Sequence, residues 1–186
     1  MDVKKNARLR ELISQPGIVV APGCHDGLTA RLVQQNGFQV CYMGGNGTMA
    51  SYLGIPDIGL GTATEMITRA RYLAEVLDIP LVCDADTGYG DVSSVVRTVR
   101  EYEAAGVSGI HFEDQVMPKK CGSMGGGQVV PVEEICAKIK AALEARRDPN
   151  FMIIARTDCF NTLGIDEAID RCKKFWDVGA DMLMPE

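Results

Sequence analysis

The chain has 186 residues, of which 46% are hydrophobic and 24% charged, a composition that indicates a folded domain and excludes a disordered or collagen-like chain. Its longest apolar runs fall far short of the about 18 to 20 residues of a membrane-spanning helix, so we expect no membrane partner. A formal net charge of −6 argues against a nucleic-acid partner, because binding a phosphate backbone requires clustered basic residues.

Six short apolar runs rich in Val and Ile are predicted to form buried strands. In chain order they are Ile18–Ala21, Gln39–Met43, Leu81–Asp84, Gly109–Glu113, Met152–Arg156 and Asp181–Met184. Apolar residues recur at helical spacing between the runs, most clearly within 66–77, 92–102, 135–143 and 168–176. Asp91 and Asp166 are predicted to be N-caps, and Pro131 suits the start of a helix.

A repeating unit of helix, glycine and strand supports this interpretation. Gly37, Gly106 and Gly179 are each predicted to end a helix, and the next strand ends seven residues later at Gly44, Glu113 or Glu186. Strands that alternate with helices indicate parallel βαβ units. The two candidate folds are a doubly wound sheet and a (β/α)₈ barrel.

Polar residues cluster at the predicted C-terminal strand ends, which favours the α/β (β/α)₈ TIM barrel, because all of these ends meet at one mouth. The residues are Tyr42, Asp84, Asp86, Glu113, Asp114, Arg156, Asp158 and Glu186. The turn after the first strand also lacks the GxGxxG pattern typical of a doubly wound sheet. We therefore predict a TIM barrel.

The length raises a question about the completeness of this barrel. A (β/α)₈ barrel needs roughly 250 residues, whereas six strands are counted here. Residues 1–186 are expected to form a single, incomplete TIM-barrel domain that stops after the sixth strand, either as a fragment or with its missing wall supplied by another chain. Two glycine-rich segments, 44–61 and 114–130, are expected to be active-site loops.

Paired carboxylates suggest a metal site. Asp84 and Asp86 are two residues apart at a strand end, where they repel each other unless a cation lies between them. With Glu113 at the next strand end, a hard divalent ion such as Mg²⁺ is the economical solution. The alternative is that these acids cap helices or pair with lysines.

Arg156 is flanked by apolar residues and is therefore not expected at the surface. Its planar guanidinium suits a two-point clamp on a substrate carboxylate. A buried pair with Asp158 or Glu186 is the alternative.

The seven cysteines are odd in number and include no CxxC pair, and the only histidines are His25 and His111. Neither a disulfide framework nor a zinc site is expected. Cys121 follows two lysines among glycines, and positive charge of that kind favours a reactive thiolate. A lone cysteine is, however, more often inert.

Six motifs occur in the order seen in the isocitrate lyase and phosphoenolpyruvate mutase superfamily. They are Tyr42-Met43-Gly44-Gly45, Leu53-Gly54-Ile55-Pro56-Asp57, Asp84-Ala85-Asp86-Thr87-Gly88-Tyr89-Gly90, Glu113-Asp114-Gln115, Lys119-Lys120-Cys121-Gly122 and Ala155-Arg156-Thr157-Asp158. The chain resembles that superfamily from about residue 17 to residue 186. The resemblance implies a (β/α)₈ barrel that binds Mg²⁺, or Mn²⁺, and a 2-oxo or 2-hydroxy acid at its mouth.

The resemblance also implies roles for individual residues. The metal site and its supporting shell correspond to Asp84, Asp86, Asp57 and Glu113. The substrate pocket corresponds to Tyr42, Gly44, Gly45, Asn46, Asp84, Gly122, Arg156 and Glu186. The catalytic candidates are Cys121, Tyr42, Arg156, Glu113 and Lys119.

Cys121 matches the cysteine that exchanges a proton with a carbanionic product in the lyase branch, so the resemblance favours carbon–carbon cleavage. The implied substrates are acids of the 2-methylisocitrate, 2,3-dimethylmalate or oxaloacetate type, and the implied enzyme is a homo-oligomer, a tetramer in its complete form. No apolar run follows the basic residues near the N-terminus, so we expect no secretory signal and a cytoplasmic location. Ser123, Gly127 and Gly44 depart from the usual histidine, lysine and serine, which suggests a smaller or less charged substrate. The alternatives are a phosphonopyruvate or carboxyphosphonoenolpyruvate enzyme, or a noncatalytic fragment.

Overall fold

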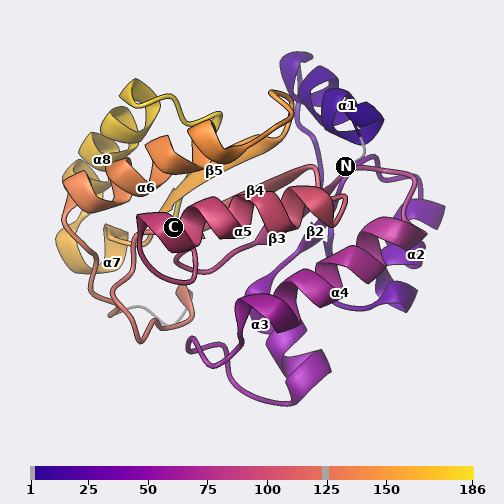
Figure 1. Cartoon of the computed structure of the whole chain (residues 1–186), viewed down its shortest axis with the longest axis horizontal. Helices are drawn as coiled ribbons and strands as arrows, with labels where there is room; N and C mark the ends of the chain where they lie inside the picture. The colour runs from indigo at the N-terminus through magenta and orange to yellow at the C-terminus, as the bar shows by residue number, and fades with distance from the viewer. Residues whose placement is uncertain (1–2, 123–125) are drawn as a thin grey trace.

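The computed structural model describes residues 3–122 and 126–186 and contains one six-stranded sheet (Figure 1). The strands are β1 (Gly23–Cys24), β2 (Cys41–Met43), β3 (Leu81–Asp84), β4 (Gly109–Glu113), β5 (Met152–Thr157) and β6 (Met182–Pro185). Each strand pairs in parallel with the next one in the chain, so the order in space is β1-β2-β3-β4-β5-β6.

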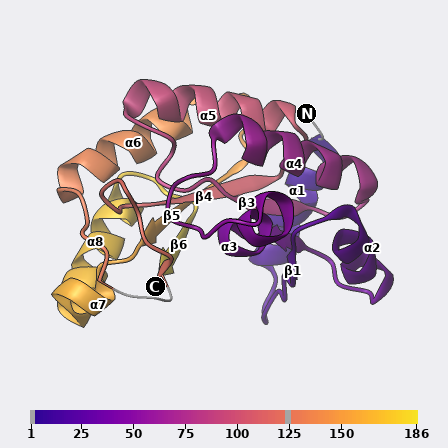
Figure 2. The same ribbon diagram turned by 90° about the horizontal axis from the view of Figure 1, so that it is seen from below.

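The described helices mostly connect successive strands, and the longer connecting ones cover one face of the sheet, whereas the first helix precedes the first strand. They are α1 (Val3–Ser14), α2 (Gly27–Gln35), α3 (Gly45–Thr48), the π-helix η1 (Met49–Leu53), α4 (Ala63–Val76), α5 (Val92–Ala104), α6 (Val132–Ala145), α7 (Phe160–Leu163) and α8 (Ile165–Asp177). Figure 2 shows the long helices α2, α4, α5, α6 and α8 in an arc around the outside of a curled sheet. Sequential strand order confirms the barrel-type α/β fold, because a doubly wound sheet reverses its order at a switch point.

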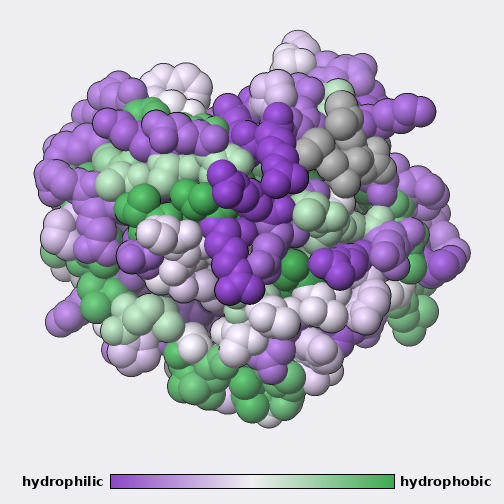
Figure 3. All heavy atoms as spheres, in the orientation of Figure 1, coloured by the Kyte–Doolittle hydropathy of each residue, from purple (hydrophilic) through white to green (hydrophobic). Residues whose placement is uncertain are grey.

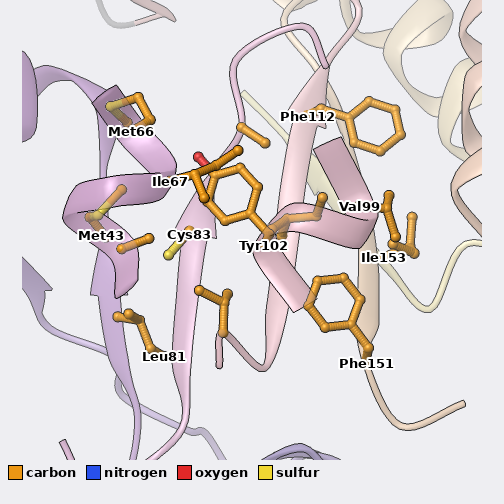
Figure 4. Packing of buried hydrophobic residues seen from close by; sticks show 14 of the residues in the cluster. Met43, Met66, Ile67, Leu81, Cys83, Val99, Tyr102, Phe112, Phe151 and Ile153 are labelled. Atoms are coloured by element: carbon orange, nitrogen blue, oxygen red, sulfur yellow. The ribbon is translucent and has the colours of Figure 1, made fainter. Parts of the chain in front are cut away.

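The larger core lies between the sheet and this arc of helices. Apolar side chains from the outer face of the strands, such as Cys83 and Phe112, pack there with those of the helices, such as Ile67 and Val99 (Figure 4). Tyr102 of α5 is fully buried in the same layer, and its hydroxyl donates a 3.0 Å hydrogen bond to the backbone oxygen of Asp84. The core therefore fixes the end of β3.

A second, smaller core lies on the inner face of the sheet. Because side chains alternate along a strand, Val82 and Ile154 face the side opposite to the larger core. They pack with Leu9 and Leu12 of α1. Figure 1 shows α1 at the end of the sheet away from α3 and α7. The helix therefore closes the N-terminal ends of the strands.

The predicted strands agree with the structure except at the first run. Residues 81–84 and 109–113 form strands with the predicted bounds, and three further runs differ by one or two residues. The prediction for Ile18–Ala21 is wrong, because β1 is Gly23–Cys24 and Ile18 is 92% exposed. An apolar run predicts a strand only where a neighbouring strand or a core covers it.

The predicted helix ends also hold, with one correction. Gly37, Gly106 and Gly179 follow α2, α5 and α8 with φ of +82°, +87° and +102°, the left-handed conformation that ends a helix. Asp91 caps α5 by accepting a 3.1 Å hydrogen bond from the Ser94 backbone N–H. The N-cap prediction for Asp166 is wrong, since α8 starts at Ile165 after Gly164.

The two segments predicted as loops differ in structure. Segment 44–61 contains α3 and η1, and a π-helix of this kind is rare and often found near functional sites. In segment 114–130 an isolated antiparallel bridge joins Gln115 to Val129.

The surface carries several exposed apolar groups. Figure 3 shows hydrophobic residues gathered at the lower edge of the view, below the position of α3 in Figure 1. Among the exposed apolar side chains, Leu60 is 57% exposed. Trp176 of α8 is 61% exposed and lines an apolar groove beside β6. None of the described helices is both long and apolar enough to span a membrane.

Candidate active site

The C-terminal ends of the strands surround a cavity of about 310 Å³. It is lined by Tyr42, Gly44, Gly45, Asn46, Gly47, Asp57, Asp84, Lys119, Cys121, Gly122, Arg156, Met184 and Glu186. The structure thus brings together most of the site residues predicted from the sequence. Glu113 and Asp86 lie beside the cavity, where both approach Lys119.

Strand register explains why these side chains meet. Asp84 of β3 lies opposite His111 of β4, and Glu113 of β4 lies opposite Arg156 of β5. Paired residues of neighbouring parallel strands point to the same face, and residues two apart on a strand share a face. All four side chains therefore project from the inner face, above the apolar layer that includes Val82.

Asp84 is held in place by the backbone. Its Oδ2 accepts a 3.0 Å hydrogen bond from the Gly45 N–H, and its Oδ1 accepts a 2.9 Å hydrogen bond from the Asp86 N–H. Asp86 itself has φ of +50°, a left-handed conformation that aspartate tolerates better than most residues. The carboxylate of Asp84 is thereby fixed at the centre of the site.

Lys119 lies within the acidic cluster. Its Nζ is 2.8 Å from Asp57 Oδ1 and 3.7 Å from Glu113 Oε1, and it also forms an ion pair with Asp86. The side chain of Lys119 is only 3% exposed. Two acids assigned to the metal shell by resemblance, Asp57 and Asp86, are therefore partnered by a lysine, which was the alternative interpretation for Asp86.

The clustered charges shift the proton affinities of these groups. Burial, together with the charge of Asp84, raises the pKa of Asp86 to about 6 and that of Glu113 well above its ordinary value. Burial acts to lower the pKa of Lys119, but Glu113 and the neighbouring aspartates raise it overall. Lys119 is therefore a permanent cation in a crowded set of acids.

His111 is a site residue that the sequence analysis missed. Its Nε2 is 2.8 Å from the Tyr42 hydroxyl, and the two rings stack with centroids 5.6 Å apart. Burial lowers the pKa of His111, so its ring is neutral near pH 7. Its place two residues before Glu113 on the same strand was the available signal, since residues at i and i+2 share a face.

The donor set fits a divalent metal ion. Potential ligand atoms of Asp84, His111 and Glu113 all lie within 4.8 Å of one another. His111 Nδ1 and both carboxylate oxygens of Glu113 are buried without a hydrogen-bond partner, an arrangement that is costly unless a ligand satisfies them. Carboxylate oxygens suit Mg²⁺ and Mn²⁺, and an imidazole nitrogen is more readily accepted by Mn²⁺.

Arg156 is clamped by acids rather than free. Its Nε and Nη2 donate to the two carboxylate oxygens of Asp158 at 2.6 and 3.0 Å, and Nη2 is 3.2 Å from Glu186 Oε2. A side chain at Gly122 would place its Cβ 2.4 Å from Arg156 Nη2, so the backbone of the Cys121 loop rests directly on this guanidinium. The thiol of Cys121 is half-buried and lines the same cavity.

Three residues, Gly44, Ser123 and Gly127, depart from the usual pattern, and the structure shows what surrounds two of them. A Cβ at Gly44 would lie 3.1 Å from the Tyr42 ring, so a serine there would press on Tyr42. A Cβ at Gly127 would lie 2.5 Å from Gln115 Oε1. Ser123 lies outside the described residues.

Gly45 offers a test of how tightly the acids are placed. A Cβ at residue 45 would lie 2.8 Å from Asp84 Oδ2 and 2.9 Å from Asp57 Oδ2. We expect Gly45→Ala to weaken divalent metal binding by about tenfold or more, because it displaces these carboxylates. Calorimetric titration with Mn²⁺ measures the effect. Gly47→Ala in the same short helix is the control, since its Cβ would have its nearest contact at 3.6 Å; equal affinities for both variants would contradict the expectation.

These observations define the class of protein: an α/β barrel-type fold with a cluster of buried acids, suited to a metal ion, at the C-terminal ends of its strands. Residues 9–186 match the family model described as phosphoenolpyruvate phosphomutase. The chain belongs to this family, within the isocitrate lyase and phosphoenolpyruvate mutase superfamily.

Several relatives carry informative names. The chain is 52% identical over 180 residues to a 2,3-dimethylmalate lyase of Eubacterium barkeri, covering 97% of this chain and 62% of the relative. A structure of oxaloacetate acetylhydrolase with 3,3-difluorooxalacetate superposes with a TM-score of 0.95 at 39% identity, covering 99% and 64% of the two chains. A phosphonopyruvate hydrolase complex with oxalate and Mg²⁺ superposes with a TM-score of 0.90 at 34% identity, covering 98% and 62%. The chain thus spans about three fifths of the length of these relatives.

Proposed function

We propose that the protein is a carbon–carbon lyase, dependent on a divalent metal ion, that cleaves a small 2-hydroxy or 2-oxo acid of the 2,3-dimethylmalate, 2-methylisocitrate or oxaloacetate type. The observation that carries this proposal is that one cavity holds a thiol, Cys121, together with the carboxylate of Asp84 and the guanidinium of Arg156. A proton donor, a cation-binding group and an anion-binding group are what such a cleavage requires.

The acidic residues would hold the metal ion. Asp84, Glu113 and His111 offer the ligand atoms. Asp57 and Asp86 lie beside them and form ion pairs with Lys119. When bound, a divalent ion stabilises negative charge that develops on substrate oxygens.

The remaining groups bind the substrate and move protons. Arg156 and the backbone of residues 44–46 bind a carboxylate, and Arg156 is kept in orientation by Asp158. Burial and the charge of Asp84 raise the pKa of Tyr42, so its hydroxyl stays protonated and serves as a hydrogen-bond donor near neutral pH.

Cys121 acts in the last step of the proposed cleavage, after the carbon–carbon bond has broken. The hydroxyl of a 2-hydroxy acid gives its proton to a carboxylate of the site, its carbon becomes the carbonyl carbon of a 2-oxo acid, and the electron pair of the broken bond passes to the departing carbon. For oxaloacetate the hydroxyl is supplied by a water molecule that adds to the 2-oxo carbon, which then becomes a carboxyl carbon of oxalate. The Cys121 thiol then donates a proton to that carbon. The name of the 52% identical relative, 2,3-dimethylmalate lyase, supports this reaction class.

Product release from a panel of acids tests the proposal. We expect pyruvate to appear from 2,3-dimethylmalate or 2-methylisocitrate, or oxalate from oxaloacetate, and the activity to disappear in EDTA and return with Mg²⁺ or Mn²⁺. The metal site predicts this dependence, because both oxygens of Glu113 are otherwise unsatisfied. Turnover that is unaffected by EDTA would contradict the metal role.

A second candidate is the cleavage or rearrangement of a carbon–phosphorus bond. The observation that favours it is the likeness of the fold to the phosphonopyruvate hydrolase complex, together with the family model itself. Phosphorus NMR of an incubation with phosphonopyruvate distinguishes the two candidates. Loss of the phosphonate signal without lyase activity on the acid panel would replace the first proposal with the second.

A further inference from the structure

Gln115 makes a compact set of polar contacts beside the cavity, outside the residues discussed as ligands or proton donors. Its side chain is buried, and its Nε2 donates to the backbone oxygen of Lys120 at 2.8 Å and to Asp158 Oδ2 at 2.6 Å. Its Oε1 accepts a 2.9 Å hydrogen bond from the Lys120 backbone N–H. One carboxamide therefore uses both of its N–H groups and its oxygen.

These contacts fix the orientation of the carboxamide. Rotating it by 180° would place its NH₂ against the Lys120 N–H and its oxygen against the Asp158 carboxylate, so only one orientation satisfies all the groups. The backbone of Gln115 is held as well, by its bridge to Val129. The site thus offers Lys120 a rigid, preorganised partner.

The contacts of Gln115 link the Cys121 segment to the substrate-binding arginine. Lys120 lies between Lys119 and Cys121 in the sequence, so fixing its backbone restrains both neighbours, and Asp158 is the acid that orients Arg156. Gln115 therefore joins the segment Lys119–Gly122 to the Arg156 pair through hydrogen bonds, in addition to the direct packing of Gly122 on Arg156.

The chain also makes room for this carboxamide. A Cβ at Gly127 would lie 2.5 Å from Gln115 Oε1, a distance that real Cβ atoms essentially never show, and 3.1 Å from its Cδ, which is also tight. Gly127, which appeared in the sequence as a departure from a common lysine, is thus the residue that permits Gln115 to occupy its position.

We propose that Gln115 is a positioning residue, which holds Lys119 and Cys121 at the cavity by binding the Lys120 backbone and which ties that segment to Arg156 through Asp158. The importance of this position for catalysis rests on the proposed function. The contacts themselves can be tested without turnover, so the two ideas can fail separately.

The first experiment measures the reactivity of Cys121 toward iodoacetamide in Gln115→Ala. We expect its alkylation rate to rise by about tenfold or more, because several buried hydrogen bonds that hold its segment are lost. Mass spectrometry after cleavage at Glu133 and Glu134 separates Cys121 from Cys136. Gln128→Ala, an exposed glutamine of the same segment, is the control and should leave the rate unchanged.

Two comparisons distinguish local positioning from general loosening. Buried Cys83 should remain as unreactive as in the wild type; an equal rise at Cys83 and Cys121, or a change at Cys121 below about twofold, would overturn the proposal. Gln115→Glu keeps the size of the side chain but turns a donor toward Asp158 and the Lys120 oxygen into an acceptor. It should raise Cys121 reactivity at least as much as Gln115→Ala does.

A second route covers the case in which Gln115 variants fail to fold. Gly127→Ala should raise Cys121 reactivity by displacing the carboxamide, and wild-type reactivity in that variant would overturn the proposal. In the lyase assay, Gln115→Ala should lower kcat by a larger factor than it raises KM, since Cys121 acts after substrate binding. A fall in thermal stability with kcat unchanged would assign Gln115 a structural role only.

Discussion

Cys121→Ser is expected to lower lyase turnover by about 10²- to 10⁴-fold, the contribution typical of a positioned acid–base group. A hydroxyl of similar size can occupy the same half-buried place at the cavity, but it is a far weaker acid than a thiol. Folding and metal binding should be nearly unchanged, because Cys121 is not among the described residues whose atoms are grouped as potential metal ligands. Steady-state kinetics with the best acid of the panel, together with thermal melts, measures both effects.

The control for this variant is Cys136→Ser. Cys136 is also half-buried, but it lies on α6 away from the cavity. The prediction fails if the turnover of Cys121→Ser is less than about fivefold below that of the wild type, because such a decrease is too small for the loss of a proton donor. Cys121 would then be only a residue of its loop.

Asp84→Asn should abolish most of the stabilisation that Mg²⁺ gives to the protein. We expect metal affinity to fall by at least about 10- to 100-fold, because the variant removes the charge of the most firmly positioned acid. In the absence of metal the variant should also melt at a lower temperature. Asparagine offers one acceptor oxygen, whereas the Asp84 carboxylate accepts from the backbone N–H groups of both Gly45 and Asp86.

Asp86→Asn should behave differently when metal is absent. The raised pKa of Asp86, about 6 against an ordinary value of 3.8, means that its ionisation costs stability as the pH rises through this window. The melting temperature of the variant relative to wild type should therefore improve between pH 4 and pH 7. Thermal melts across a Mg²⁺ titration, with exposed Asp166→Asn as a control for net charge, separate these effects. A variant of Asp84 that keeps the full Mg²⁺-induced shift would remove the metal assignment.

The sequence predicted the strands that carry the site better than the first strand of the sheet. Leu81–Asp84 and Gly109–Glu113 are buried on both faces, so their apolar composition reports their structure directly. The run at Ile18 has the same composition but is largely exposed, and local composition does not reveal which neighbours cover a segment. Strand ends were thus predictable where helices and a second strand enclose the run.

Most residues of the candidate site could be predicted from the sequence, but the contacts between them could not. Asp84 and Glu113 follow from strand ends, but the insertion of Lys119 between Asp57 and Asp86 depends on how a loop folds back over the mouth. The stacking of His111 on Tyr42 depends on two strands that are separated by β3. Such contacts arise from the curl of the whole sheet, which no local pattern encodes.

The docking of α1 has a consequence for the order in which the molecule can assemble. Arg10 of α1 binds Asp181 at 2.8 Å across a separation of 171 residues, and Asn6 binds Asp148 at 2.9 Å across 142 residues. The outer core can grow as each strand–helix unit leaves the ribosome, because its contacts are mostly between neighbours in the chain. The helix α1 must instead wait for the segments that lead into β5 and β6, which follow it by more than 130 residues, so the inner apolar layer beneath the active site is completed later than the outer layer of the preceding units.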